Sequence, residues 1–374
     1  MTTHLKRVET VRQGSADGRG MVLRLTTKTD VEIYVIAVPP DNDALTGPTW
    51  SYLFKEDALT LIDPGPTGSF HVLGEGIQCT GYKIKEIERI IITHGHADHD
   101  GSVAQLVDES GAELWAHDIY SHLLPFDPRD IQLRPTSSIK QEMARVVAAQ
   151  GVMLPSSAAR HSYLARRRRL EVNHPIQAME TSGSFTFFQL PGHSPDHICV
   201  TFDGLVFTGD HVLPEISPHP TMKTQYAPEV KQGMPARYHD ENQSYGLARY
   251  LRSLKVIVEL GEDVGVMPAH RLFNKNKLNF DSALRAEAII QHHTERLGQI
   301  LERIGNEPAS LESVTRRTFE HRKLAGRNLF AALTEVVAHV EFLEDAGDLE
   351  VTEDGLLRRT GRDNYHRIVQ EIAS

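Results

Sequence analysis

Short apolar runs separated by polar turns occupy the first third of the chain, and they predict a unit rich in β-strands. Residues 22–37 predict two strands joined by a polar turn, and a second pair is expected at residues 50–54 and 59–63. Three β-branched residues at positions 90–92 are typical of the end of a buried strand. Helices and a further strand are expected at residues 69–77, 101–110 and 113–117.

The pattern of short apolar runs and polar turns changes between about residue 119 and residue 181. Two helical stretches, near residues 138–150 and 156–170, stand where a short connection would be sufficient, and we interpret them as an inserted helical cap. Strands are expected again beyond this insertion, followed by a helix and a last strand, at residues 184–190, 197–202, 205–208, 245–253 and 264–267.

From residue 281 onward the pattern becomes helical, with one long amphipathic stretch and two shorter ones at residues 283–304, 310–319 and 329–346. Two apolar segments then flank Thr352-Glu-Asp-Gly355, whose Asp-Gly pair is typical of a hairpin turn. Helices followed by a β-hairpin indicate a winged-helix-like α+β module. Because 374 residues are too many for one ordinary core, we expect a first domain of residues 1–280, with the insertion at about 119–181, and a second of residues 281–374.

Composition narrows the class of protein. The hydrophobic content of 40% and the charged content of 24% are those of a soluble globular protein. The net charge of −10 argues against a general nucleic-acid binder. The two cysteines, Cys79 and Cys199, indicate neither a disulfide framework nor a thiolate metal site. Since the first residues lack the apolar run of a secretory signal and no stretch approaches the roughly 20 apolar residues that span a bilayer, we expect a cytoplasmic protein with no membrane contact.

Four potential metal ligands follow the apolar run at positions 90–92 within six positions: His94, His96, Asp98 and His99. Imidazole nitrogen and carboxylate oxygen both bind zinc well. Residues two apart point the same way in an extended chain, so His94 and His96 can reach one metal, while Asp98 and His99 can face a second one. A single histidine at a strand end is usually solvated or hydrogen-bonded, but four such residues favour a metal site.

Three further candidates occur just after other apolar runs. His193 lies in a turn fixed by glycine and proline, Asp210 ends Val206-Phe-Thr-Gly-Asp210, and His270 ends Val266-Met-Pro-Ala-His270. Asp63 stands in the same position at the end of an earlier strand. Any one of them alone would more often be a cap than a ligand. Their recurrence at strand ends is what indicates one shared site.

The ordered set Thr93-His-Gly-His-Ala-Asp-His99, Gly192-His193, Gly209-Asp210 and Ala269-His270 resembles the metallo-β-lactamase superfamily over roughly residues 22–274. The resemblance implies an α/β fold, an αββα sandwich with the site at one sheet edge. It also implies the site residues: one zinc ion at His94, His96 and His193, a second at Asp98, His99 and His270, Asp210 bridging them, Asp63 orienting a ligand, and His197 in a structural role.

A centre of this kind implies hydrolysis. Zinc lowers the pKa of bound water to about 7, so a hydroxide bridging two ions exists at neutral pH and can attack a carbonyl carbon or phosphorus. Asp98 could take the proton of the nucleophile, although a metal-bound carboxylate is a weak base and this role would be secondary. The same ligands also accept iron or manganese, so the identity of the two metals stays open.

Asp210 and the C-terminal region bear on the branch of the superfamily. A bridging aspartate resembles hydrolases of the glyoxalase II type, lactonases and nucleases more than true β-lactamases, although no glutathione-binding residues of glyoxalase II can be matched. The leading hypothesis is a dinuclear zinc hydrolase of a small ester or thioester, with an acyl-CoA-like substrate as one option. The alternatives are a metal-dependent endoribonuclease, because that group carries a similar appendage, and a mononuclear iron dioxygenase on the same fold.

A winged-helix-like module also raises the hypothesis of a DNA-binding regulator. The helix in the recognition position, residues 329–346, has four acidic residues and no lysine or arginine: Glu335, Glu341, Glu344 and Asp345. Phosphate contact requires the opposite charge. We therefore expect a small-molecule substrate, no specific DNA binding, and a module that packs on the sandwich or forms the face of a homodimer.

Substrate contacts are less constrained by the sequence than the metal ligands are. Arg160 and the run from Arg166 to Arg169 close a predicted helix, where cations complement the helix dipole and can simply be solvated. Alternatively, Arg160 and Arg166 hold an anionic substrate tail, since guanidinium groups bind carboxylates and phosphates well. His211, His219 and Tyr245 lie near the ligand-bearing loops and could line the pocket, although each alone is more often structural.

Overall fold

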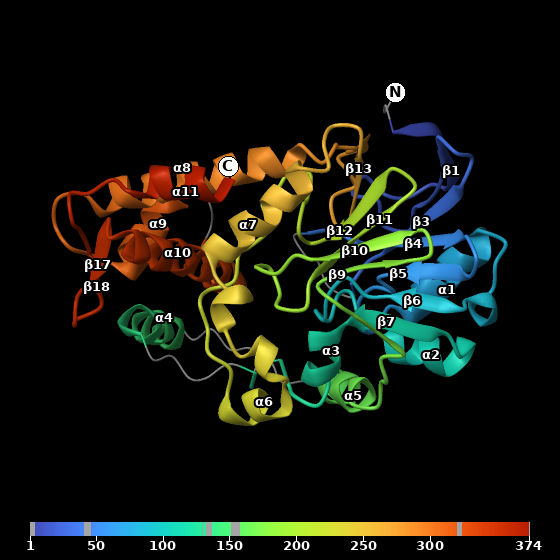
Figure 1. Cartoon of the computed structure of the whole chain (residues 1–374), viewed down its shortest axis with the longest axis horizontal. Helices are drawn as coiled ribbons and strands as arrows, with labels where there is room; N and C mark the ends of the chain where they lie inside the picture. The colour runs from blue at the N-terminus through green and yellow to red at the C-terminus, as the bar shows by residue number, and fades with distance from the viewer. Residues whose placement is uncertain are drawn as a thin grey trace.

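Two β-sheets packed face to face form the centre of the molecule (Figure 1). The computed structural model describes residues 4–40, 46–128, 130–131, 137–150, 158–319 and 324–373. The first sheet has eight strands in chain order: β1 Leu5–Arg12, β2 Val22–Thr27, β3 Glu32–Val38, β4 Thr49–Lys55, β5 Leu59–Ile62, β6 Arg89–Ile91, β7 Glu113–His117 and β8 His174–Ile176. Pairing is antiparallel from β1 to β5 and parallel from β5 to β8.

The second sheet has five strands in the order β13-β12-β11-β10-β9. Its strands are β9 Met179–Ser182, β10 Phe185–Gln189, β11 Ile198–Phe202, β12 Leu205–Gly209 and β13 Gly265–Pro268. The pairs from β9 to β12 are antiparallel, and β12 pairs with β13 in parallel. As a result β10, β12 and β13 run in the same direction and end at the same edge of the sheet.

Strand β4 shows why these sequences form a sandwich. Its residues Trp50, Tyr52 and Phe54 alternate with polar or smaller ones, so they point to one face and enter the core between the sheets. Leu53 points the other way, into the core beneath the outer helices. Inside the sandwich the Phe54 ring stacks on Phe207 of the second sheet, with ring centres 5.7 Å apart.

Helices cover both outer faces. Helices α1 (Phe70–Cys79) and α2 (Val103–Ser110) pack on the first sheet, while α7 (Leu247–Val258) and the start of α8 (Arg285–Ile304) pack on the second. The fold is therefore the αββα sandwich that the sequence predicts. Among the described residues, no helix combines the length and the apolar character needed to traverse a lipid bilayer.

The C-terminal part follows α8 with α9, α10, a hairpin and a last helix (Figure 1). These elements are β16 Ala309–Ser310, α9 Leu311–Thr318, α10 Arg327–Ala346, β17 Leu349–Val351, β18 Leu356–Arg359 and α11 Tyr365–Ala373. The predicted helices and hairpin are confirmed, and their three short strands pair in the order β16-β18-β17. One apolar cluster runs without a break from the second sheet through α7 and α8 to α10 and α11. The core therefore shows no interruption at the proposed boundary near residue 280.

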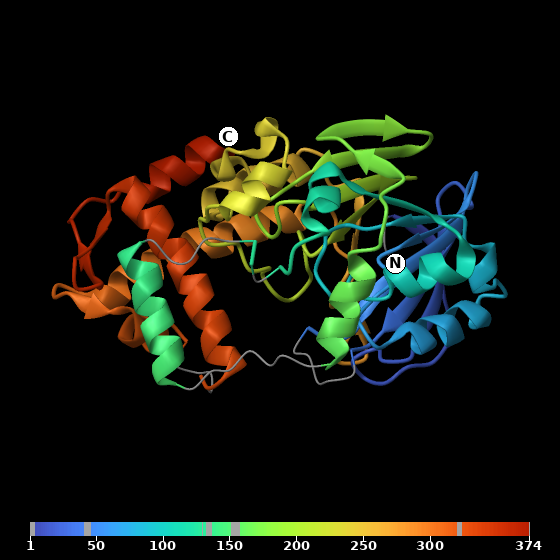
Figure 2. The same cartoon turned by 90° about the horizontal axis from the view of Figure 1, so that it is seen from below.

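The two predicted helices of the insertion pack on different parts of the molecule (Figure 2). Helix α4 (Ser138–Ala149) lies against α9 and α10, whereas α5 (Ala158–Arg167) lies beside α2. Residues 156 and 157, where the second helix was expected to begin, lie outside the described residues. That the insertion caps a site stays a prediction. The prediction missed several elements: β1, β8, β9, α3 (Asp118–Leu123), α6 (Pro228–Gly233), α11, β16 and the hairpin β14 (Phe273–Asn274) and β15 (Lys277–Leu278).

Candidate metal centre

The seven predicted ligands come from loops that leave four strands at adjoining sheet edges. Strand β6 precedes the loop with His94, His96, Asp98 and His99, and β10, β12 and β13 precede His193, Asp210 and His270. Gly209 allows β12 to end close to the first loop. Its φ is +49°, and a Cβ atom there would lie 2.5 Å from the Thr93 hydroxyl. A glycine is therefore required immediately before Asp210.

Three histidines form the first group, which we call the three-histidine group: His94, His96 and His193. His94 Nε2 and His96 Nδ1 are 2.9 Å apart, and His96 Nδ1 and His193 Nε2 are 3.2 Å apart. Two nitrogens bound to one tetrahedral zinc ion at 2.0–2.1 Å would lie about 3.3 Å apart. The spacing of these nitrogens therefore fits one metal ion.

The second group, called the mixed group, contains Asp98, His99, Asp210 and His270, and one donor atom from each lies within 4.8 Å of the others. His270 Nε2 is 3.4 Å from oxygens of both Asp98 and Asp210, and His99 Nε2 is 3.5 Å from Asp210 Oδ1. The other carboxylate oxygen of Asp210 is 3.6 Å from His193 Nε2 in the three-histidine group. Asp210 thus lies between the two groups.

In three of the five ligand histidines, the Nδ1 atom has a partner that fixes the orientation of the ring. His99 Nδ1 lies 2.9 Å from Asp63 Oδ2, His270 Nδ1 lies 3.0 Å from the Pro48 carbonyl oxygen, and His193 Nδ1 lies 3.0 Å from the His219 carbonyl oxygen. Donation by Nδ1 leaves the Nε2 lone pair directed at the centre.

Three polar atoms at the middle of the site test whether a metal fits. His99 Nε2, His270 Nε2 and Asp210 Oδ1 are buried, and none has a hydrogen-bond partner within the part of the chain that the structure describes. Buried polar atoms are rarely left unpaired in proteins. A cation bound between the imidazole and carboxylate groups would satisfy all three atoms, so the donor set fits a metal.

The electrostatics of the two groups differ. Burial, reinforced by neighbouring histidines, lowers the pKa of His94 and brings the pKa of His193 to about 4, so both rings are neutral and able to ligate. In the mixed group, burial disfavours charged His99, but Asp210, Asp63 and Asp98 outweigh it and raise the pKa of the ring. This excess of negative charge attracts a cation.

Two aspartates that the sequence did not reveal as functional support the loop at residues 94–99. Asp196 accepts the Gly95 N–H at 2.8 Å, and a Cβ on Gly95 would lie 2.8 Å from the Tyr120 ring. Asp100 is buried and accepts hydrogen bonds from Tyr120, Tyr163 and Arg167 at 2.9, 2.6 and 3.1 Å. Both acids stand within the ligand motifs, but spacing alone does not separate a supporting aspartate from a ligating one.

Asp63 and His197, which are predicted to support the site, both lie beside ligand histidines. Asp63 accepts hydrogen bonds from the Thr93 N–H and hydroxyl at 2.8 and 2.7 Å in addition to its contact with His99. The His197 ring is fully buried and stacks on the His94 ring with centres 4.9 Å apart. Neither nitrogen of His197 belongs to a donor group of the described residues. This position agrees with a structural role.

The predicted substrate-binding residues are largely engaged by the chain itself. Arg160 pairs with Asp127, and Arg166 donates to the Ser162 hydroxyl at 2.8 Å. Tyr245 is 5% exposed and packs edge-on against Tyr226. His219 is partly exposed and meets the site through its carbonyl oxygen. Their roles toward a substrate stay predictions.

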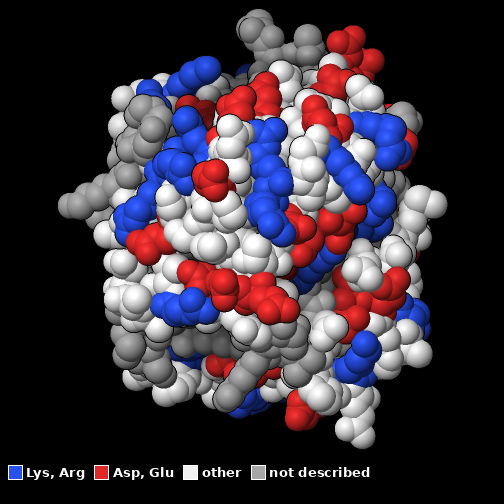
Figure 3. All heavy atoms as spheres, turned by 90° about the vertical axis from the view of Figure 1, so that its left-hand side faces the viewer, with Lys and Arg blue, Asp and Glu red and all other residues white. Residues whose placement is uncertain are grey.

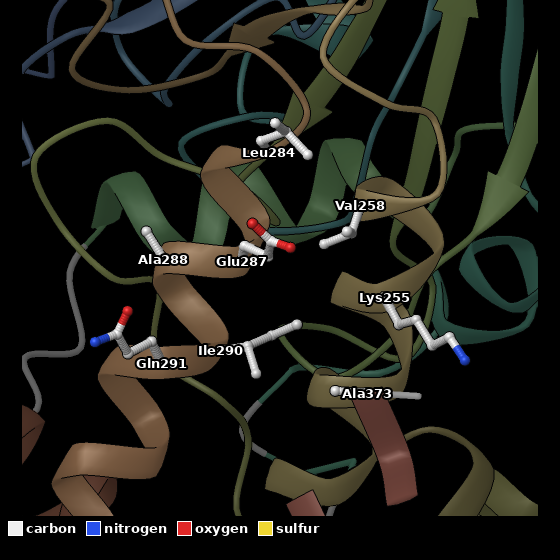
Figure 4. A pocket seen from close by; sticks show the side chains of 8 residues that line it. All are labelled: Lys255, Val258, Leu284, Glu287, Ala288, Ile290, Gln291 and Ala373. Atoms are coloured by element: carbon white, nitrogen blue, oxygen red, sulfur yellow. The ribbon is translucent and has the colours of Figure 1, made fainter. Parts of the chain in front are cut away.

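A separate hollow of about 460 Å³ lies between α7, α8 and the end of α11 (Figure 4). Its lining is mostly aliphatic, with Lys255, Glu287 and Gln291 as polar members. Glu287 is the one carboxylate in this lining, and none of the lining residues belongs to a donor group found among the described residues.

The sequence model of the family described as "Metallo-beta-lactamase superfamily" matches residues 44–270. The probable metallo-hydrolase YqjP of Bacillus subtilis is 24% identical over 324 residues, which cover 83% of this chain and 92% of that protein. A second protein of this bacterium, the probable metallo-hydrolase YflN, is 26% identical over 42% of this chain and 56% of its own length.

Solved structures show the same fold. A metallo-beta-lactamase family protein of Thermus thermophilus matches with a TM-score of 0.61 and 20% identity, covering 87% of this chain and 98% of that one. A beta-lactamase domain protein of Burkholderia ambifaria matches with a TM-score of 0.64 and 20% identity, covering 93% and 96%. The shared fold therefore extends beyond the sandwich into the C-terminal helices.

Proposed function

Because this chain belongs to the metallo-beta-lactamase superfamily, we propose that it is a metal-dependent hydrolase whose centre holds two divalent metal ions. One observation carries this proposal. Two groups of donor atoms meet at Asp210, and the buried atoms His99 Nε2, His270 Nε2 and Asp210 Oδ1 have no hydrogen-bond partner among the described residues. We infer that His94, His96 and His193 hold one ion and that Asp98, His99 and His270 hold the other, with Asp210 shared.

Divalent ions at these positions would lower the pKa of water toward 7 and polarise the bond to be cleaved. The chain supplies orientation and charge. Asp63 and the Pro48 carbonyl fix the rings of His99 and His270. The Asp98 side chain is 43% exposed, so a water molecule or substrate can approach it. Partial burial of Asp98 opposes its ionisation, but His99 and His270 outweigh this effect and hold its pKa below the usual range. Asp98 is therefore ionised at neutral pH, where it has no proton to donate and is a weak base.

We propose zinc as the metal and a small ester or thioester as the substrate. Two features favour a small molecule over a long anionic polymer such as RNA. The arginine run is occupied by the chain, since Arg167 binds Asp100 and Arg168 donates to the Pro125 carbonyl oxygen. Figure 3 shows acidic and basic side chains interspersed on the face formed by the C-terminal helices, without a continuous basic surface on the visible described atoms.

Metal analysis followed by a hydrolysis screen tests this proposal. Purified protein is expected to contain about two zinc ions per chain and to cleave thioesters or lactones, and chelation should abolish cleavage. The screen also includes phosphodiesters, a single-stranded RNA and a cephalosporin. One iron ion and no zinc per chain would contradict the mechanism, and cleavage of the RNA alone would replace the proposed substrate class.

A further inference from the structure

Residues 217–224, which we call the support loop, touch the three-histidine group directly. The His219 carbonyl oxygen accepts the Nδ1–H of His193 at 3.0 Å. Two residues later, Thr221 donates both its N–H and its hydroxyl to the Gly192 carbonyl oxygen, at 2.7 and 3.0 Å. The orientation of the His193 ring therefore depends on where this loop lies.

The other side of the support loop is held by the acidic residues of α10. Glu341 accepts the Lys223 N–H at 2.7 Å, and Asp345 pairs with the Lys223 ammonium group. Six residues before Glu341 on the same helix, Glu335 Oε2 lies 3.8 Å from His219 Nε2. Three of the four acids that argue against phosphate binding thus have a partner in the support loop.

These carboxylates are neutralised from two further helices. Arg296 of α8 pairs with Glu335 at 2.8 Å, and Lys140 of α4 pairs with Glu341 at 3.2 Å. Lys140 also donates to the Lys223 carbonyl oxygen. Glu341 is only 5% exposed. A buried carboxylate is retained only with good partners, and here two of the partners are the support loop and the helix of the insertion.

We propose that Glu335 and Glu341 are positioning residues of the metal centre, which hold the support loop so that the His219 carbonyl orients His193 for metal binding. This inference rests on the proposed function. It gives the C-terminal helices a role in the centre although none of their described residues belongs to either donor group. The mixed group does not depend on this loop, because His99 and His270 are oriented by Asp63 and Pro48.

The test uses the full chain with Glu335→Gln, Glu341→Gln and the double variant. Glu344→Gln is the matched control, because Glu344 is an exposed acid of the same helix. Zinc affinity is measured by competition with a chromophoric chelator, and the visible spectrum of cobalt-loaded protein reports the ligand geometry. The melting temperature of each metal-free variant shows that it is folded.

Two ligand variants show which group loses zinc affinity when the glutamates are replaced. His96→Ala removes a ligand of the three-histidine group and leaves the mixed group intact, whereas His270→Ala removes a ligand of the mixed group and leaves the three-histidine group intact. Partners that orient a ligating histidine typically change metal affinity 10- to 100-fold, and because these glutamates act through one more residue we expect about tenfold. The double variant should weaken zinc binding about tenfold in the His270→Ala background and leave it unchanged in the His96→Ala background.

The inference would be overturned if the double variant bound zinc as tightly as Glu344→Gln in both backgrounds. It would also be overturned if the double variant lost the same zinc affinity in the two backgrounds, because that result would indicate a general effect on folding. In either case the wild-type chain would still bind two ions and the proposed function would stand. A wild-type chain that binds no zinc would instead remove the proposed function and this inference together.

Discussion

The carboxylate of Asp63 receives the Nδ1–H of His99 at 2.9 Å, and it does so from a residue whose own backbone has a left-handed φ of +49°. The same carboxylate holds the N–H of Thr93 at the start of the ligand loop. One side chain therefore fixes both the position of the loop and the orientation of a ring in the mixed group.

Asp63→Asn should lower the affinity for one metal ion about 10- to 100-fold, because an amide is a poorer acceptor than a carboxylate for the ring N–H. Chelator competition measures this loss. Asp203→Asn is the matched control, since Asp203 also has a positive φ but lies on the surface in contact with Thr29. Similar affinities in the two variants would show that Asp63 does not orient His99.

His96→Ala should remove one ligand of the three-histidine group. The metal content is expected to fall from two ions to about one per chain, hydrolysis should be lost, and the fold should persist because His96 lies outside the apolar core. His71→Ala, on the exposed side of α1, is the control and should change neither quantity. An unaltered zinc content in His96→Ala would contradict the assignment.

Arg167→Met should reduce the free energy of unfolding by about 3–5 kcal/mol, because it leaves the buried carboxylate of Asp100 without its cation. Urea unfolding of the metal-free protein measures the change. In Arg169→Met the lost partner is the exposed Asp108, 3.8 Å away, and the expected cost is below about 1 kcal/mol. Equal costs would mean that the Arg167 pair contributes no more than a surface contact.

Acid should destabilise the protein through His339. Burial is the main cause that lowers the pKa of this ring, to about 4, and its Nε2 lies 3.1 Å from His293 Nδ1. The unfolded chain takes up a proton at about pH 6.5, whereas the folded ring does so only near pH 4. Stability should therefore be independent of His339 above pH 6.5 and fall as the pH decreases toward 4, by up to about 3 kcal/mol.

Urea unfolding of metal-free wild-type protein and His339→Gln at pH 7.5 and pH 5 measures this contribution together with the effect of His339 on the neighbouring His293 ring. The variant should lose less stability than the wild type between the two pH values. An identical loss in both proteins would show that the pKa of His339 does not differ between the folded and the unfolded chain.

The sequence was sufficient to predict most strands of the sandwich, though not β1, β8 or β9, and the seven residues that the structure brings together. Alternating apolar residues define β4, and a polar residue directly after an apolar run marks a sheet edge, so both signals are local. The roles of Asp100 and Asp196 were not predictable, because both lie in the ligand motifs and only the folded chain shows that they face Tyr163 and Gly95 instead of the centre.

Contacts between residues that are far apart in the chain explain the remaining differences between the prediction and the structure. The arginine run suggested substrate contacts, but Arg167 binds Asp100, 67 positions away in the chain. Helix α4 was expected to belong to one inserted unit with α5, and its sequence did not reveal that it packs on α9 and α10. An amphipathic helix shows which of its faces is buried, but its sequence does not identify the surface that covers that face.

The parallel pairing of β12 and β13 has a consequence for the order of assembly during synthesis. Asp210 and His270 become neighbours only after the intervening residues, including α7, have left the ribosome and β13 has joined the sheet. If the acids of α10 also fix His193, a nascent chain reaches its full affinity for metal only when nearly all of it has been translated. Chains truncated before α10 would then bind metal more weakly than the complete chain.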